Sequence, residues 1–488
     1  MRHCSTAQHR AEWICQLMMS DRPHGLLSQL SRTHHVSRQT LYRWKAKGEQ
    51  ALQKALGADL PQPAQNMQLD QQVLTLLIEA HASYRNIQTC LLKLCGTHVS
   101  LGRISGIVQQ AGQRAQAWLD RQRASTPRAL ALDEQYSSQR GKAYLNVIDV
   151  HSSQVWATLP PVEVDGESWT LVWWYLQEQG LLCDCSVSDG GRAIHEALSQ
   201  VQRRARHQRD VWHLLHVASQ VQGRLDRALQ QAQDRLPAIQ RQAQRLAEGQ
   251  KTRGRAPKAD VGEQQARISR MKYVADGVRY LLQELRTLLE VVVLSAAQQT
   301  GVLSSQLRQA EIEAVLALLD ELQTQASAAL QSQIQSLSKH IRLALSHVLL
   351  FARDLDEIQR LACEKLGPQA VQVLAWAWQR RAVLGPTTND LVKSVEPAWQ
   401  AVAQELLSAW DHAVRASSAV ENWHSIVRPH LAVHRTLSAE MLALLAVWHN
   451  HHQAPRGPHF GLSPLQRTGS TQPEMDWLAA LGYTAQAA

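Results

Sequence analysis

The chain lacks both the cysteine spacing of a zinc ribbon and the long apolar run of a membrane span. Its 488 residues include seven cysteines, none in a CxxC pair. We therefore interpret the cysteines as reduced, mostly buried thiols. The longest apolar candidate, 288–297, is too short to cross a bilayer, and no basic-then-apolar leader opens the chain. These absences predict a soluble protein of the cytoplasm.

Phenylalanine is also scarce, whereas tryptophan and histidine are abundant. Two phenylalanines stand against 15 tryptophans, which we interpret as core or interface aromatics. Among the 22 histidines, His449, His451 and His452 invite a metal-site interpretation. Adjacent positions on one helix do not converge easily on one ion, so the pattern disfavours a structural zinc site.

Positive charge exceeds negative charge and gathers near the N-terminus. Lys and Arg number 51 against 42 Asp and Glu, giving a net charge of +9. Residues 1–50 hold eight of these cations and three acids. The excess favours a polyanionic partner, contacted first by a small N-terminal unit.

Residues 24–48 have the pattern of two short helices joined by a tight turn. Ser37 is a natural N-cap and Gly48 a natural stop. This pattern indicates a helix-turn-helix, whose second helix enters the major groove of DNA. We expect Arg38, Gln39 and Thr40 to face base edges, and Arg43, Lys45 and Lys47 to meet phosphates. A helical hairpin with a solvated basic face is the alternative.

A second and weaker copy of this pattern follows a linker marked by Pro61 and Pro63. A helix is expected to start at Tyr84, and residues 99–108 predict another capped, recognition-like helix that carries Arg103. Two tethered units would cover a longer DNA site than one, with higher joint affinity.

From residue 128 onward the pattern becomes that of a sheet. Strands are expected over 129–136, 143–150 and 153–159, followed by a helix over 166–179. The region is completed by a buried strand over 181–187, a helix over 190–206 and a last strand over 210–215. The order β-β-β-α-β-α-β matches the ribonuclease-H-like layout.

Two aspartates stand where this sheet could support chemistry. Asp133 lies on the central first strand, and Asp189 ends the fourth strand beside it. Ligands bind at the carboxyl ends of strands in open α/β sheets, and grouped carboxylates suit Mg²⁺. Asp189 could equally cap the following helix.

A long helical segment separates these aspartates from the third acid. Heptad-like apolar seams over 221–246 and 268–292 predict an antiparallel helical hairpin. Its tip carries Lys251, Arg253 and Arg255, which could touch DNA or form a solvated loop. Further helices are expected over 302–415.

A final helix is expected to begin near residue 419. It places Glu421, Ser425 and Arg428 on one face, as a metal ligand beside a phosphate contact requires. The alternative is a surface ion pair between Glu421 and Arg428. Glu405 and Glu440 are possible substitutes for Glu421.

The chain resembles the DDE-type transposases of bacterial insertion sequences, a branch of the ribonuclease-H-like polynucleotidyl transferases. The resemblance rests on the helix-turn-helix units, then Ala-Leu-Asp133-Glu, Val-Ser-Asp189-Gly-Gly and Glu421-Asn-Trp-His-Ser-Ile-Val-Arg-Pro, in that order. The segment 209–213 looks like the strand after the second catalytic aspartate, and 461–465 is similar to the C-terminal tails of such enzymes.

The expected fold is therefore multidomain, with N-terminal all-α helix-turn-helix domains and an α/β ribonuclease-H-like core interrupted by a large all-α insertion. The predicted domains are two helix-turn-helix units over 1–56 and 67–124, core parts over 125–215 and 416–454, the insertion over 216–415 and a tail over 455–488.

The resemblance implies catalytic metal ligands Asp133, Asp189 and Glu421. Two Mg²⁺ ions, with Mn²⁺ as a substitute, would sit roughly 3.5 to 4 Å apart and clamp the scissile phosphate. The implied partners are double-stranded DNA of transposon terminal inverted repeats and target sites, with a homodimer or larger oligomer on DNA in the bacterial nucleoid. An inactive transposase-derived regulator that binds specific DNA is the leading alternative, and a structure-specific nuclease is another.

Overall fold

The computed structural model describes residues 6–19, 23–55, 67–121, 129–181, 183–201, 206–249, 260–295, 301–384, 392–457, 459–469 and 476–483. The chain is mostly helical, with one small mixed sheet. It divides into two compact units, Met1–Asp70 and Gln71–Ala488. No helix in the described ranges combines the length and apolar character needed to cross a membrane.

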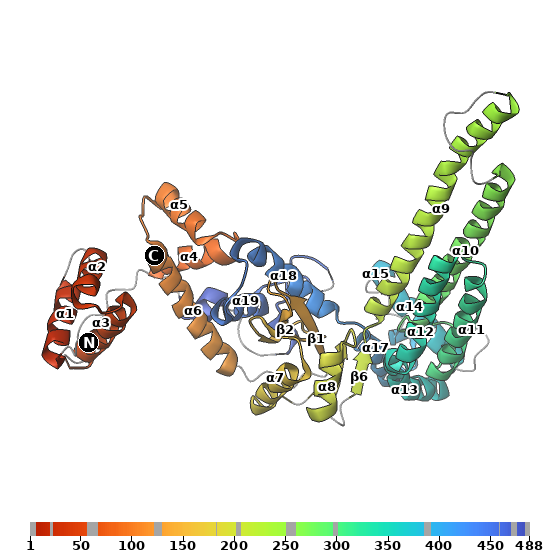
Figure 1. Cartoon of the computed structure of the whole chain (residues 1–488). Helices are drawn as coiled ribbons and strands as arrows, with labels where there is room; N and C mark the ends of the chain where they lie inside the picture. Colours follow the sequence, from red (N-terminus) through yellow and green to blue (C-terminus); the bar gives the residue numbers. More distant parts are fainter. Residues whose placement is uncertain are drawn as a thin grey trace. The chain divides into compact units, whose positions relative to one another are not determined.

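Three helices form the first unit: α1 (Ala7–Met19), α2 (Pro23–His34) and α3 (Arg38–Ala55) (Figure 1). The turn predicted between the last two is confirmed, and the Thr40 amide donates to Ser37 Oγ at 3.1 Å. Helix α1 was not predicted. The predicted stop at Gly48 is wrong, because α3 continues past it. Glycine serves close packing there, since a Cβ would lie 2.5 Å from Ile14 Cγ2.

The second unit begins with α4 (Met67–Ile78), which spans the boundary, α5 (Tyr84–Cys95) and α6 (Leu101–Arg121). The expected start at Tyr84 is confirmed, and the Ser83 side chain caps it. The recognition-like helix starts two residues later than predicted and runs on to Arg121. It packs along α19 (Ala439–His451), within the same unit as the sheet.

The sheet consists of β1 (Ala129–Tyr136), β2 (Lys142–Asp149), β3 (Val155–Thr158), β4 (Val162–Glu163), β5 (Cys185–Ser188) and β6 (Arg206–Arg209). Its order is β3-β2-β1-β5-β6, with β4 also on β2. β2 is antiparallel to β1 and β3, whereas β5 is parallel to β1 and β6. The first three predicted strands are confirmed, the strand predicted over 181–187 begins at Cys185, and β4 was not predicted.

The strand predicted over 210–215 is wrong. The last strand, β6, ends at Arg209, and Val211 already begins α9 (Val211–Ala247). Asp210 explains the change, because its carboxylate accepts hydrogen bonds from the Trp212 and His213 amides and so caps a helix.

Helices cover both faces of the sheet. On one face, α7 (Gly166–Glu178) and α8 (Arg192–Val201) share a core with the apolar residues of β1 and β2. On the other face, α18 (Ser418–His434) packs on β1 and β2, and α19 packs on β3 (Figure 1). β1 is therefore covered on both faces and paired on both edges.

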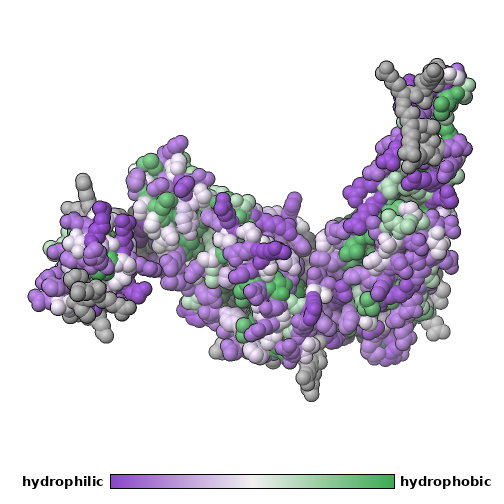
Figure 2. All heavy atoms as spheres, in the orientation of Figure 1, coloured by the Kyte–Doolittle hydropathy of each residue, from purple (hydrophilic) through white to green (hydrophobic). Residues whose placement is uncertain are grey.

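The segment between β6 and α18 is helical, as predicted, and has its own core. It contains α9, α10 (Val261–Leu288), α11 (Ser305–Gln323), α12 (Ala328–Val348), α13 (Leu350–Leu366), α14 (Pro368–Gln379), α15 (Arg381–Leu384), the 3₁₀ turn η1 (Pro397–Trp399) and α17 (Gln400–Asp411). Helices α9 and α10 pair as the predicted hairpin (Figure 1). In Figure 2 the visible face of these helices is mostly hydrophilic. The tip with Lys251, Arg253 and Arg255 lies outside the described residues.

Two short helices, α20 (Pro464–Arg467) and α21 (Trp477–Ala480), complete the described chain. The buried ring of Tyr483 lies under the Arg114 guanidinium of α6, 4.8 Å from its centroid. The C-terminal segment thus packs on the helices that precede the sheet.

Candidate active site

Asp133 lies in the centre of the sheet, on the face covered by α18. Side chains alternate along a strand, so Leu130 and Leu132 enter the core under α7 and α8 while Asp133 points to the other face. Only 9% of the residue is exposed. Its Oδ2 lies 3.9 Å from His424 Nδ1 of α18.

Asp189 follows the neighbouring parallel strand. Val187 pairs with Ala131, so the register brings Asp189 level with Asp133 on adjacent strands. Asp189 Oδ1 accepts the Gly191 amide at 2.7 Å, which steadies the turn into α8. Gly190 has a φ of +83°, and a Cβ there would lie 2.9 Å from Arg209 Cζ, so the turn requires glycine.

Asp210 brings the helix of Glu421 to this sheet. Its Oδ2 accepts the Ser417 amide at 2.8 Å and the Ser417 hydroxyl. The Val211 amide donates to the Arg415 carbonyl at 3.1 Å. The two ends of the helical insertion are thus joined at one point, although Asp210 and Ser417 are 207 residues apart. Glu421 follows one turn later on α18.

The structure brings Asp133 and Glu421 together with a histidine that the sequence reasoning did not select. One ligand atom from each of Asp133, His213 and Glu421 lies within 4.8 Å of the other two. His213 stands in the first turn of α9, fixed there by the Asp210 cap. The Asp-Val-Trp-His spacing was the available signal, but a strand interpretation of 210–215 concealed it. Among the described residues, Asp189 belongs to no group of three possible metal ligands whose atoms lie within 4.8 Å of one another.

A buried amide sets the orientation of His424. Asn146 Oδ1 accepts hydrogen bonds from Trp423 Nε1 at 2.9 Å and from Thr158 Oγ1 at 2.8 Å. Asn146 Nδ2 therefore faces His424 Nε2, 3.2 Å away, and donates to it. The ring proton is left on Nδ1, which lies 3.9 Å from Asp133 Oδ2 and 4.0 Å from Glu421 Oε2.

Burial controls protonation in this cluster. Burial, together with the negative charges of Asp189, Glu421 and Glu134, raises the pKa of Asp133 to about 7. Burial also raises the pKa of Glu134, which accepts Trp169 Nε1 at 2.9 Å. Burial lowers the pKa of His424 to about 4, so its ring is neutral near pH 7. A cation placed among the carboxylates would favour their charged forms.

Arg428 is exposed to solvent and also forms an ion pair with Glu421. Its Nη2 lies 3.3 Å from Glu421 Oε2, and 60% of the Arg428 side chain is exposed. The predicted shared face of α18 is therefore present, and so is the ion pair that was its alternative.

The DNA contacts predicted on α3 belong to the first unit, and Arg103 belongs to the second. Arg38, Gln39, Arg43 and Lys47 are exposed on α3, and Arg103 is exposed on α6. Two others have local partners: Thr40 Oγ1 lies 2.7 Å from Ser37 Oγ, and Lys45 pairs with Glu49 at 3.3 Å.

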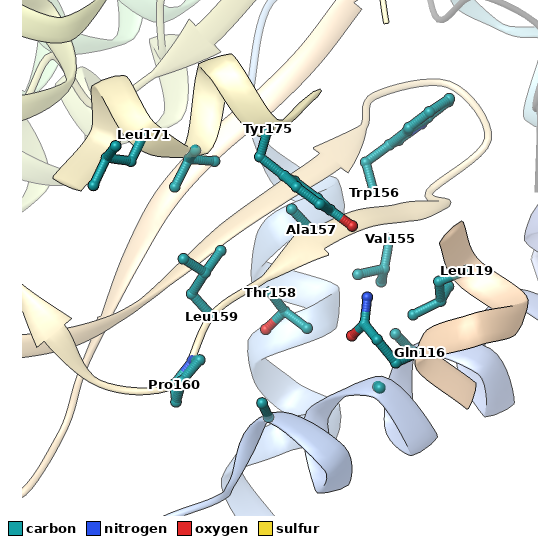
Figure 3. Close-up of a pocket in the computed structure, with 14 residues that line it drawn as sticks. Gln116, Leu119, Val155, Trp156, Ala157, Thr158, Leu159, Pro160, Leu171 and Tyr175 are labelled. Carbon is teal, nitrogen blue, oxygen red and sulfur yellow. The ribbon is translucent and has the colours of Figure 1, made fainter. Parts of the chain in front are cut away.

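An apolar cavity of about 350 Å³ lies beside β3, away from the acids. Figure 3 shows Tyr175, Leu171 and Val155 around it, with Gln116 from α6 at its edge. No carboxylate or histidine lines this cavity, so it offers no ligand set for a metal. A second cavity, of about 460 Å³, adjoins the acids and is lined by Trp212, Leu215, Arg415 and Glu421 among others.

Comparison with known proteins gives one family match. Residues 63–245 match the family model of the Mutator family of transposases. This similarity supports a transposase. The matched range includes Asp133, Asp189 and His213, and ends before Glu421. No curated protein sequence matches the chain.

Proposed function

We propose that this chain is a DDE-type DNA transposase with a ribonuclease-H-like core, which binds transposon ends, hydrolyses a phosphodiester and transfers the resulting 3′-OH into target DNA. The observation that carries the proposal is the convergence of Asp133, Glu421 and His213, which come from β1, α18 and α9, so that their ligand atoms lie within 4.8 Å of one another. The sheet order and the similarity to Mutator transposases support it.

The donor set suits a divalent cation. Two carboxylates and an imidazole nitrogen lie within 4.8 Å of one another, and burial, followed by the charges of the neighbouring carboxylates, raises the pKa of Asp133. Asp133, Glu421 and His213 would hold the metal, and Asp189 would complete the set from the adjacent strand. Bound Mg²⁺, or Mn²⁺ in its place, would supply charge neutralisation and polarise the scissile phosphate.

The remaining residues would position DNA around this point. His424 Nδ1, 3.9 Å from Asp133 Oδ2 and 4.0 Å from Glu421 Oε2, would place its proton beside the two carboxylates. Arg428, largely exposed beside Glu421, would exchange that carboxylate for a DNA phosphate. On α3, the exposed side chains of Arg38, Gln39 and Arg43 would contact bases of the transposon end. The protein would then act in the cytoplasm, on the DNA of the nucleoid.

The test is metal-dependent cutting and joining of labelled DNA taken from the flanks of the coding region. Wild type should cut and join with Mg²⁺ or Mn²⁺, whereas Asp133→Asn, Asp189→Asn and Glu421→Gln should lose at least 100-fold in rate and still bind the DNA. Asp184→Asn, an exposed aspartate just before β5, is the matched control. Cutting by Asp133→Asn at the wild-type rate would refute the proposal, and specific binding without cutting by wild type would indicate a regulator.

A further inference from the structure

A third cavity, which is basic, lies on the opposite side of α18 from the carboxylates. Its volume is about 600 Å³. Residues 418, 419, 422 and 426 of α18 form one wall, and the segments 448–456 and 459–467 form others. We call it the tail cavity, because the C-terminal segment closes it.

Charge and exposure in the tail cavity fit an anion. Arg456 and Arg467 line it together with His452 and His459, and no Asp or Glu does so among the described residues. Arg456, His452 and His459 are exposed, so the cavity opens to solvent as a groove. A ligand longer than a small ion could therefore enter and leave along it.

Arg467 carries a donor without an acceptor. Its Nε is buried and has no hydrogen-bond partner among the described residues. Burial lowers the pKa of Arg467, and the charge of Asp149 opposes that effect. Asp149 is itself occupied, since its Oδ1 accepts the amides of His151 and Ser152 at 2.8 and 2.7 Å. A phosphate oxygen would satisfy the Arg467 donor.

The histidines of the tail cavity do not form a metal site. His449 Nε2 lies 2.9 Å from the Ser153 carbonyl oxygen and donates to it, and the His452 ring stacks on Trp448 at 4.6 Å. The described residues contain no converging group of three that includes these histidines. They form a polar lining beside the two arginines.

The first turn of α18 connects the tail cavity with the candidate active site. Ser418 lines both the tail cavity and the 460 Å³ cavity that contains Glu421. Glu421 and Asn422 are consecutive on the helix, so they point to different sides, one to each cavity. A DNA strand with one phosphate at Glu421 could continue past Ser418 into the tail cavity.

We infer that the tail cavity binds a phosphodiester of the DNA strand that leaves the active site, through Arg456 and Arg467. This inference rests on the proposed function, because it assumes DNA at Glu421. It assigns to the C-terminal segment the task of holding the strand beyond the point of cutting.

The test measures DNA binding without cutting, in the full-length Asp133→Asn protein with a chelator. Anisotropy of a labelled duplex is followed across salt concentrations. Loss of one phosphate contact should lower the salt slope of log K by about 0.9 and weaken binding equally for flank and unrelated sequences. Arg456→Gln should therefore lower the slope by about 1, and Arg456→Lys should restore it.

Arg360→Gln is the control, because Arg360 is exposed on α13 and already paired with Glu357 and Glu364. Its slope should stay at the starting value. Adding Arg467→Gln to Arg456→Gln should lower the slope by about 2 in all. If both arginine variants keep the starting slope and affinity, the inference is wrong.

A competition arm separates DNA from a free anion. Inorganic phosphate at constant ionic strength should not displace the duplex. Displacement that disappears in Arg456→Gln would assign the cavity to free phosphate and overturn the inference. Failure of the proposed function is distinguishable, because it shows as absent cutting by wild type, whereas the binding slopes do not depend on cutting.

Discussion

At the scale of single residues, Asn146 fixes the orientation of His424 through its hydrogen bonds. Its oxygen receives two donors, so its amide nitrogen must serve His424, which in turn faces Asp133 and Glu421. Asn146 is itself 1% exposed, with no solvent to replace these bonds. The tautomer of His424 therefore depends on Asn146, which is also the cross-strand partner of Asp133.

Replacing Asn146 with Ala should disturb the site through His424. The His424 ring would lose the donor that fixes its tautomer, and loss of such supporting contacts typically costs 10- to 100-fold in metal affinity or activity. Mn²⁺ binding by calorimetry and the cutting rate should both fall in that range. Asn86→Ala, at an exposed position on α5, should change neither. Unchanged Mn²⁺ affinity in the Asn146 variant would contradict this role.

The raised pKa of Asp133 predicts a pH-dependent change in stability. A carboxyl group whose pKa rises from 3.8 to about 7 on folding binds its proton more tightly when folded. The folded state thus loses stability as the pH rises through that window, and the loss is complete above it. With a chelator present, Asp133→Asn should raise the free energy of unfolding at pH 8 by roughly 1 to 4 kcal/mol.

Because asparagine resembles the protonated aspartate, the same variant should match wild type near pH 4. Urea unfolding at the two pH values measures the difference. If the variant and wild type differed by the same free energy of unfolding at both pH values, the pKa of Asp133 would not be raised in the folded protein.

The sequence identified Asp133, Asp189 and Glu421 from their immediate neighbours, and the structure brings the first and last together. It did not identify His213, Asn146 or His424 as parts of the site. Their surroundings are created by contacts across the chain, such as the Asn146–His424 pair at a separation of 278 residues. Local sequence patterns do not reveal such pairs.

At the scale of secondary-structure elements, the junction of α9 and α18 determines whether Glu421 reaches the sheet. Asp210 is 2% exposed and accepts four hydrogen bonds, two from the first turn of α9 and two from Ser417. An acceptor of this kind contributes roughly 1.5 to 3 kcal/mol per charged hydrogen bond, although such values do not add simply.

Asp210→Ala should therefore lower the free energy of unfolding by roughly 3 to 5 kcal/mol, because it leaves buried donors unpaired. It should also reduce cutting beyond detection, since the start of α18 is released. Thermal unfolding and the cutting assay measure the two effects. Asp234→Asn, exposed on α9, should leave both near wild type. An Asp210→Ala protein that cuts normally would show that Glu421 is held by other contacts.

Elements with a long apolar period were predictable, whereas their ends were not. The heptad seams gave the α9 and α10 hairpin, even across Pro237, which lies inside α9 without ending it. The apolar run after Asp210 fitted a strand and a helix equally, and the cap decided for the helix. Gly48 illustrates the converse, because close packing against Ile14 required glycine where no helix ended.

At the scale of the whole molecule, the proposed DNA-reading helix α3 and the candidate active site belong to different units. Unit Met1–Asp70 has its own small core of Leu17, Leu27, Leu30 and Leu41, whereas the carboxylates belong to the second unit. The division was foreseeable from the charge excess and the helix-turn-helix pattern. The close packing of α6 on α19 was not, because it joins segments far apart in the sequence.

Substitutions in α3 should therefore change which DNA is bound and leave the chemistry intact. Gln39→Ala should lower the preference for flank DNA over shuffled DNA by roughly 5- to 100-fold, as loss of one base contact costs about 1 to 3 kcal/mol. Competition binding at fixed salt measures this. Gln8→Ala, an exposed glutamine on α1, is the control. A preference unchanged by Gln39→Ala would place base recognition elsewhere.

Under the proposed function, the distance along the chain between Asp210 and Ser417 also has a consequence for the time at which activity would first appear. A ribosome adding about 5 to 20 residues per second needs roughly 10 to 40 s to cover the 207 residues between them. Until then the nascent chain holds Asp133 without Glu421. In a cell where messenger RNA is translated beside its own gene, an unfinished chain would thus be unable to cut the DNA from which it is being expressed.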